Sequence, residues 1–259
     1  MPDWNRVALG NRFLLAQTPF LFIFPFSFCD MAPCSDVVSR FLWDLGYSFC
    51  HQLSERSFTI SGCQLPLCAR DTGTGIGFMV VLLIYLLGRR YRFSVIFDRK
   101  ILFYCVIGFV AFAFDAATSY IGLRDTNNWI RFFTGYLAGS SGGFMLLTVL
   151  SFAFFKGSRD AKVFDWKDIL IALGALLLFS LALYTLNDSQ ILYYIFAITS
   201  IAGLLTLLFL GLFLASYLIL EGKLKEKNLA TVSLSLSIIL GIALIVLLHY
   251  FHQATINLP

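Results

Sequence analysis

Long runs of hydrophobic residues, separated by short polar segments, make up most of the chain. A helix needs about 20 apolar residues to cross the hydrocarbon core of a bilayer. Seven runs come close to this length: residues 13–33, 71–88, 101–121, 129–155, 168–186, 191–220 and 229–251. The pattern therefore predicts an all-α, polytopic integral membrane protein with about seven transmembrane helices. The first run is the least regular, because Pro19 and Pro25 kink a helix.

The runs predict one membrane domain over residues 1–259, with no separate soluble domain. The main polar interval, residues 34–70, is too short to bury a core of its own. We expect spans 2–4 (residues 71–155) to carry a polar site and spans 5–7 (residues 168–251) to be almost purely apolar. Composition agrees, because 59% of residues are hydrophobic and 13% are charged, whereas soluble domains carry about 25% charged residues.

Lysine and arginine gather in alternate loops, which predicts the orientation. The basic segments are residues 88–100, 156–167 and 221–227. Because cytoplasmic loops carry an excess of positive charge, we expect a cytoplasmic N-terminus and an external C-terminus, in the cell (inner, cytoplasmic) membrane. The basic residues behind the net charge of +4 are then expected to orient the protein in the membrane. This charge does not predict nucleic-acid binding; the expected partners are membrane lipids, with a homo-oligomer or membrane-complex partner left open.

Residues 34–70 lie on the outer face in this orientation and predict a small cap. Ser35 or Asp36 can begin a helix by accepting hydrogen bonds from its first N–H groups. Apolar residues then recur every three or four positions, which is typical of an amphipathic helix lying at the membrane interface. These residues are Val38, Phe41, Leu42, Leu45 and Phe49. The loose alternation around Ser61-Gly62 predicts a short hairpin.

Four potential metal ligands occur in and just after this cap: Cys50, His51, Cys68 and Asp71. Zinc binds four such groups, and Cys68 and Asp71 are one helical turn apart. The sequence therefore predicts a site for zinc or another divalent metal. Adjacent Cys50 and His51 can both bind only if the backbone turns sharply, so one of them can instead support the other ligands.

Disulfides are the main alternative to a metal at these positions. Five cysteines face an oxidising compartment in the predicted orientation, where disulfides form; they are Cys29, Cys34, Cys50, Cys63 and Cys68. The pairs Cys63–Cys68 and Cys29–Cys34 are close enough in sequence. A redox dithiol is a third alternative. Cys105, inside a span, is expected to be a packing residue.

Ionisable residues also gather at the outer ends of three spans. An ionisable residue inside a span marks a functional site by default, and Asp115 is the clearest example. Arg70, Arg124, Asn127 and Arg131 lie at the same predicted depth. We interpret the group as an outer-facing pocket, with Asp115 as general base or orienting carboxylate. The alternative is that Asp115 pairs with Arg131 or Arg70 only to hold helices together.

Glycines near two span starts predict close helix packing, and two histidines near the C-terminus are expected at the surface. Glycines recur every four positions near the starts of spans 2 and 4, which lets membrane helices approach closely; they are Gly73, Gly77, Gly135, Gly139 and Gly143. Close packing there would bring Arg70 and Asp71 toward Arg131. His249 and His252 are expected to have an interfacial surface role.

Two stretches, "CHQLSERSF…GCQLPLCARDTG" and "FDAATSYIGLRDTNNWIRFFTGYLAG", resemble the motifs of a family of prokaryotic integral membrane proteins of unknown function. The resemblance covers about residues 50–75 and 115–139. Three departures stand out: Ser54 replaces a usual proline, Ala116 a usual glycine, and Asp71 a cysteine of many members. The motif positions are Cys50, His51, Gln52, Arg56, Ser57, Phe58, Gln64, Cys68, Arg70, Asp71, Thr72, Gly73, Asp115, Arg124, Asn127, Arg131 and Gly135.

The resemblance implies no reaction, but the exchange at position 71 favours a metal. Cysteine and aspartate share the ability to bind a metal as anions. Three functions follow for comparison. The first is a metal-dependent enzyme acting on a lipid or amphiphilic anion, which Arg56, Arg70, Arg124, Asn127 and Arg131 would bind. The others are a structural or accessory subunit with a metal- or disulfide-stabilised cap, and a transporter.

Overall fold

The structure, a computed structural model, describes residues 36–88, 98–154 and 163–256. These residues belong to one compact unit, Met31–Pro259. The predicted span at residues 13–33, together with Cys29 and Cys34, lies outside the described residues.

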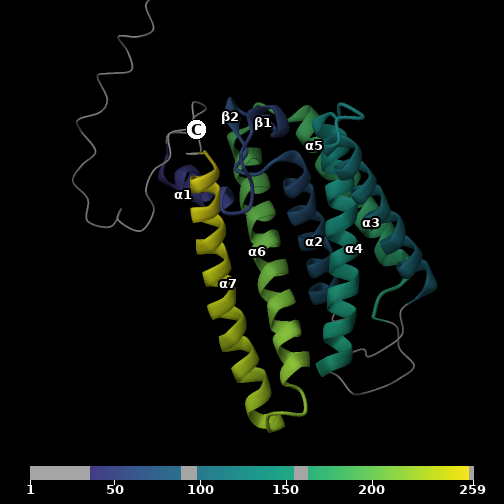
Figure 1. Cartoon of the computed structure of the whole chain (residues 1–259). Coiled ribbons are helices and arrows are strands. Elements are labelled where there is room, and N and C mark those ends of the chain that lie inside the picture. Colours follow the sequence, from purple (N-terminus) through teal and green to yellow (C-terminus); the bar gives the residue numbers. More distant parts are fainter. Residues whose placement is uncertain (1–35, 89–97, 155–162, 257–259) are drawn as a thin grey trace, which may run out of the picture. The chain divides into compact units, whose positions relative to one another are not determined.

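Six long helices confirm the predicted spans within the described part of the chain (Figure 1). Each is long and apolar enough to cross a membrane. They are α2 (Ala69–Leu87), α3 (Arg99–Tyr120), α4 (Asn128–Phe154), α5 (Trp166–Thr185), α6 (Gln190–Leu220) and α7 (Glu226–Ile256). Their bounds differ from the expected ones by a few residues, mostly at the ends, where caps rather than hydropathy decide.

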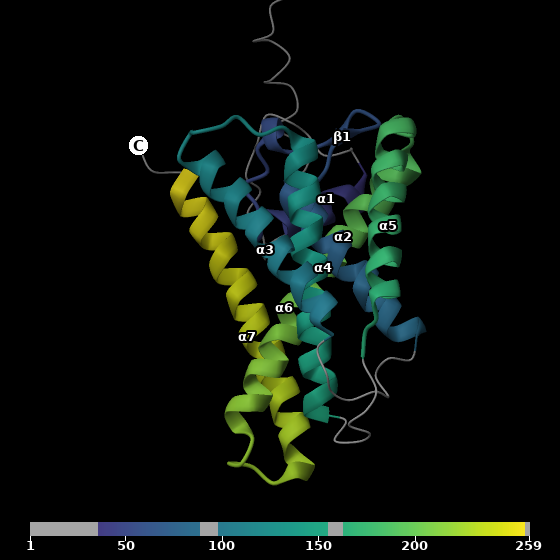
Figure 2. The same ribbon diagram turned by 90° about the vertical axis from the view of Figure 1, so that its right-hand side faces the viewer.

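Helix α2 is the centre of the packing, with α4 and α6 as its main neighbours. Helix α3 packs on α4, and α7 packs on α6. Helices α5 and α7 lie on opposite sides of the bundle in two perpendicular views (Figures 1 and 2). Neighbours in the chain run in opposite directions, so the start of α2, the end of α3 and the start of α4 meet at one end.

The predicted close approach of spans 2 and 4 is confirmed. A Cβ atom added at Gly73 would collide with the Phe132 carbonyl oxygen. One added at Gly135 would collide with the Arg70 carbonyl oxygen. The two backbones therefore touch where the candidate site begins, and only glycine fits at these positions.

Gly139→Ala is expected to lower the free energy of unfolding, whereas Gly142→Ala on the same helix is not. A Cβ at Gly139 would meet the Thr74 carbonyl, but nothing lies within 4 Å of one at Gly142. Both changes gain about 1 kcal/mol of helix propensity, so their difference isolates the overpacking, typically about 1–3 kcal/mol. Thermal unfolding in detergent measures both variants. Equal stability of the two would contradict the close packing of α2 against α4.

Residues 36–68, which we call the cap segment, precede α2. The segment begins with α1 (Val37–Tyr47), and Asp36 caps this helix by accepting from the Ser39 N–H at 3.0 Å, as predicted. The expected amphipathic face needs correction, because Leu42 and Trp43 are buried while Val38 and Phe41 are exposed. The exposed pair leaves an apolar face for the membrane interface.

The predicted hairpin is also confirmed. After a short 3-10 helix, η2 (Ser54–Arg56), strands β1 (Thr59–Ile60) and β2 (Cys63–Gln64) pair antiparallel. Ser61 and Gly62 turn between them with φ of 54° and 75°. Two successive positive φ values match the twist of a two-residue hairpin, and glycine adopts such a value freely. The Ser61 N–H donates to the Asn187 carbonyl at 2.7 Å, which ties the hairpin to the α5–α6 loop.

Candidate functional site

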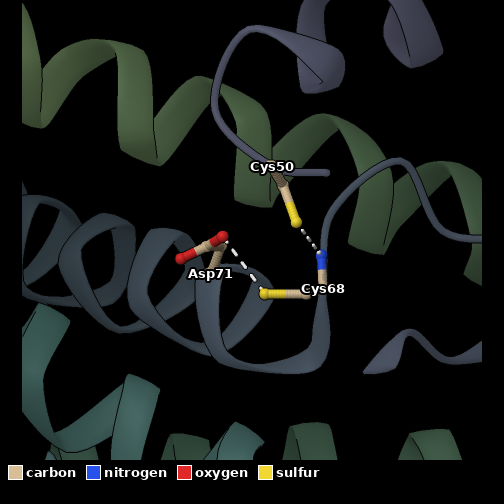
Figure 3. Close-up of side chains that lie close together, drawn as sticks. All are labelled: Cys50, Cys68 and Asp71. Atoms are coloured by element: carbon tan, nitrogen blue, oxygen red, sulfur yellow. Dashed lines mark hydrogen bonds between the residues drawn. The ribbon is translucent and has the colours of Figure 1, made fainter. Parts of the chain in front are cut away.

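Three of the four predicted metal ligands come together where the cap segment meets α2 (Figure 3). One ligand atom from each of Cys50, Cys68 and Asp71 lies within 4.8 Å of the other two. Cys68 is the N-cap residue of α2, and Asp71 lies in the first turn of that helix. The one-turn spacing seen in the sequence therefore places both side chains on the same side of the helix start.

Hydrogen bonds of the cap segment bring Cys50 beside Cys68. Gln52 is buried with a left-handed φ of 53°, so the chain turns sharply just after Cys50. Its side-chain Nε2 donates to the Trp43 carbonyl at 2.7 Å and to the Pro66 carbonyl at 3.1 Å. These bonds join the end of α1 to the residues before α2. The sequence motif pointed to Gln52, and the structure gives it a positioning role.

The three side chains already bond to one another. The Cys68 thiol donates to Asp71 Oδ2 at 3.1 Å, and the Cys68 N–H donates to Cys50 Sγ at 3.2 Å. The pKa of the Cys68 thiol is raised by its hydrogen bond with Cys50, by burial and by the negative charge of Asp71. A bound cation reverses these effects, because a coordinating thiol is deprotonated outright.

His51 lies outside this group. Its exposed side chain packs against His252, with ring centroids 4.2 Å apart. Partial desolvation and the nearby His252 lower the pKa of His51. His252 and His249 are buried, not at the surface as expected, and His252 Nδ1 lies 2.7 Å from the Tyr47 carbonyl oxygen. Tertiary contacts thus gather all three histidines of the chain, a grouping that sequence spacing does not reveal.

The state of four cysteines decides part of the question whether disulfides replace a metal here. Cys50, Cys68 and Cys105 are free thiols, whereas Cys63 is disulfide-bonded. The suggested Cys63–Cys68 pair is therefore wrong. Cys105 is buried in α3, as expected for a packing residue, and its thiol lies 3.5 Å from the Ser141 carbonyl oxygen. Two thiols thus stay available beside Asp71.

Asp115 is the centre of a second polar cluster at the same end of the helices. Its Oδ2 accepts from Arg70 Nη2 at 2.6 Å, and its Oδ1 accepts from Arg124 Nη2 at 2.8 Å. The Asp115 side chain is only 2% exposed. Of the two expected alternatives, Arg70 or Arg131, the structure pairs Asp115 with Arg70. Arg124 was missed as a partner, although it follows α3 by only four residues.

The remaining predicted residues are Arg131, Asn127 and Arg56. Arg131 Nε donates to Thr126 Oγ1 at 3.0 Å, and its Nη1 donates to Asn128 Oδ1 at 3.2 Å. Asn127 accepts from the Ile130 N–H at 2.8 Å, so it caps the start of α4. Arg56 is exposed on η2. Asn127 is therefore a capping residue, whereas Arg56 and Arg131 are arginines that make no ion pair within the described residues.

Comparisons with known proteins agree with the predicted membrane class. Residues 50–147 match the family model described as "Predicted membrane protein (DUF2085)". An uncharacterized protein of Methanothermobacter thermautotrophicus is 33% identical over 91 residues, which are 35% of this chain and 77% of that relative. The chain belongs to this family. An uncharacterized protein of Methanocaldococcus jannaschii is 36% identical over 102 residues, or 39% of this chain.

The family match begins at Cys50 and ends inside α4, so it contains both polar clusters but not α5–α7. The chain spans 62% of the length of the M. jannaschii relative. No solved structure matches this chain. Membership in the family therefore supports a multi-pass membrane protein. It indicates no reaction, so any chemistry has to be argued from the site.

Proposed function

We propose that Cys50, Cys68 and Asp71 bind a divalent metal, with zinc as the best fit. Two thiolates and a carboxylate suit zinc, and soft thiolate ligands disfavour magnesium and calcium. Tetrahedral zinc at ordinary bond lengths holds such ligand atoms about 3.5–3.8 Å apart. The observed group, within 4.8 Å, needs only a modest contraction. This convergence is the observation that carries the proposal.

The described residues supply three protein ligands, and a site with three is the catalytic rather than the structural type, because it leaves one position open. His51 would have to leave His252 to fill that position, so we assign it to water or substrate. A zinc ion held in this way activates water or polarises a substrate oxygen. The chain's own groups would then bind and orient the substrate. We accordingly propose a metal-dependent enzyme as the function.

The basic cluster beside the centre suggests an anionic substrate. Both oxygens of Asp115 accept from arginines, so we assign it to orienting Arg70 and Arg124 rather than to proton transfer. Positive charge at a membrane surface binds the anionic group of a lipid or amphiphile. We place the cap segment outside the cell membrane, following the distribution of basic loops.

A structural or accessory subunit is the second candidate. The buried Asp115 ion pairs favour it, because they join the start of α2 to α3 and to the residues that follow α3. A metal at Cys50 and Cys68 would then only stabilise the cap segment. The two functions share the metal and differ in whether its open position accepts a ligand.

Elemental analysis of the purified protein tests the metal centre. We expect about one zinc per chain in the wild type and loss of the metal in Cys68→Ser, because a serine hydroxyl is a poor zinc ligand. Cys105→Ser is the matched control, since Cys105 is a free thiol outside the group. A Cys68→Ser variant that keeps its zinc would sink the proposal. Binding of a small anion such as cyanide to the cobalt-substituted protein, seen in its visible spectrum, would separate the enzyme from the structural subunit.

A further inference from the structure

Four arginines lie at the end of the bundle beside the proposed metal centre, together with the buried carboxylate of Asp115 and the partly buried one of Asp71. Arg70 and Arg124 share Asp115, so this trio keeps a net charge of +1. Arg56 and Arg131 form no ion pair within the described residues. The nearby carboxylates of Glu55 and Asp125 are exposed and bond to neither arginine in this part of the chain. Two guanidinium groups without a direct counter-charge are what an anion would neutralise.

Arg131 is the best-oriented member of the unpaired set. Its two hydrogen bonds go to neutral oxygens, at 3.0 Å to Thr126 and 3.2 Å to Asn128, which fix the guanidinium without neutralising it. The cation is partly buried. Arg56 and Arg70 repel it, and the Asp115 carboxylate attracts it without bonding to it directly. Like charges are held together in this way at a cost, which a bound anion offsets.

A hydrogen bond also connects the residue after Arg56 to this position. Asn128 holds Arg131 through its Oδ1, while its Nδ2 donates to the Ser57 carbonyl at 3.0 Å. Ser57 directly follows Arg56 at the end of η2. The start of α4 and the cap segment are thereby joined, with one arginine on each side of the bond.

One further observation suggests the nature of the anion. Trp129 lies in the first turn of α4 and packs on Phe58, with ring centroids 5.4 Å apart. Tryptophan at a span end lies at the depth of lipid headgroups. Guanidinium groups at that depth suit a phosphate, which they bind through paired N–H donors.

We propose that Arg131 and Arg56 bind a phosphate group, from a lipid headgroup or a free phosphate ester, beside the Cys50, Cys68 and Asp71 centre. Arg70 and Arg124, which Asp115 holds in place, add positive charge at the same end of the helices. This phosphate site would hold the anionic substrate of the proposed enzyme. Only the chemical conversion of the bound compound rests on the proposed function. Binding itself requires no metal.

Titration calorimetry of the full chain in maltoside micelles, which contain no phosphate, tests this. The probes are inorganic phosphate and a short-chain phosphatidic acid. Arg131→Gln and Arg56→Gln are each expected to weaken binding at least about tenfold, the usual loss of a charge-assisted hydrogen bond. Arg131→Lys should weaken it too, because a lysine cannot bind in a bidentate manner.

Arg99→Gln is the matched control, because it removes the same charge from an exposed residue at the other end of α3. Its affinity should equal that of the wild type. Saturable binding of phosphatidic acid alone would identify a lipid headgroup as the ligand, and binding of both probes a phosphate from either source. Wild-type protein that binds neither probe, or an Arg56→Gln variant with undiminished affinity, would overturn the proposal. Arg56 is exposed, so that variant is expected to fold.

Metal analysis of the same samples separates the two proposals. Zinc without phosphate binding would remove the phosphate site and leave the metal centre. Arginine-dependent phosphate binding without zinc would do the reverse.

Discussion

Asp71→Cys is expected to keep the bound metal, whereas Asp71→Ala is expected to lose it. Cysteine can replace the carboxylate as an anionic ligand from the same helical turn, beside Cys68. Alanine leaves two of the three ligands that the described residues supply. Since changes outside the ligand set already cost roughly 10–100-fold in metal affinity, we expect Asp71→Ala to weaken zinc binding by more than about 100-fold. Competition with a chromogenic chelator measures the affinity.

Asp44→Ala is the control for this pair. Asp44 is a half-buried carboxylate of α1 in the same cap segment, outside the three-residue group, and its loss should leave zinc affinity unchanged. The ligand assignment fails if Asp71→Ala binds zinc as tightly as the wild type. It also fails if Asp71→Cys folds but binds no metal, because the family resemblance predicts that either residue serves at this position.

Asp115→Asn is expected to lower the free energy of unfolding by about 3–5 kcal/mol, the usual cost of removing one partner from a buried ion pair. The change leaves Arg70, whose side chain is 13% exposed, without its anion inside a membrane protein. Arg124 is 40% exposed and can reach water, so most of the loss should come from Arg70. Unfolding in mixed micelles measures the change.

Asp125→Asn provides the matched comparison, because it makes the same chemical change at an exposed residue ten positions away. Its stability should stay within about 0.5 kcal/mol of the wild type. The folded fraction of Asp115→Asn should still bind zinc, since Asp115 is not in the ligand group, but should lose activity on an anionic substrate. Loss of zinc from this folded fraction would contradict the separation into a metal centre and an orienting carboxylate.

Local pattern was enough to predict the parts of the molecule that depend on short stretches of chain. Apolar runs predicted six spans now seen as α2–α7, because a bilayer requires a continuous apolar helix. Asp36 and the Ser61-Gly62 pair predicted a helix start and a hairpin, since caps and tight turns depend on a few adjacent residues.

Partners distant in sequence were predicted only in part. The family resemblance indicated Cys50, Cys68 and Asp71 together, but it also included His51, which turns toward His252 instead. Arg124 was expected to bind an anion, and the structure pairs it with Asp115. The buried face of α1 was shifted by one position, because a short helix with apolar residues on two sides has no unique orientation until its neighbours are known.

The sequence by itself determined that this is a multi-pass helical membrane protein with its reactive side chains at one end of the helices. Hydropathy and loop charge are local properties that can be read from short stretches of chain. Because successive spans run in opposite directions, the end of one span and the start of the next lie at the same depth in the membrane. Only the tertiary structure decided which of those side chains meet. Rotation of each helix about its axis is set by contacts such as Gly73 on Phe132 and Gly135 on Arg70, and those contacts join residues about 60 positions apart.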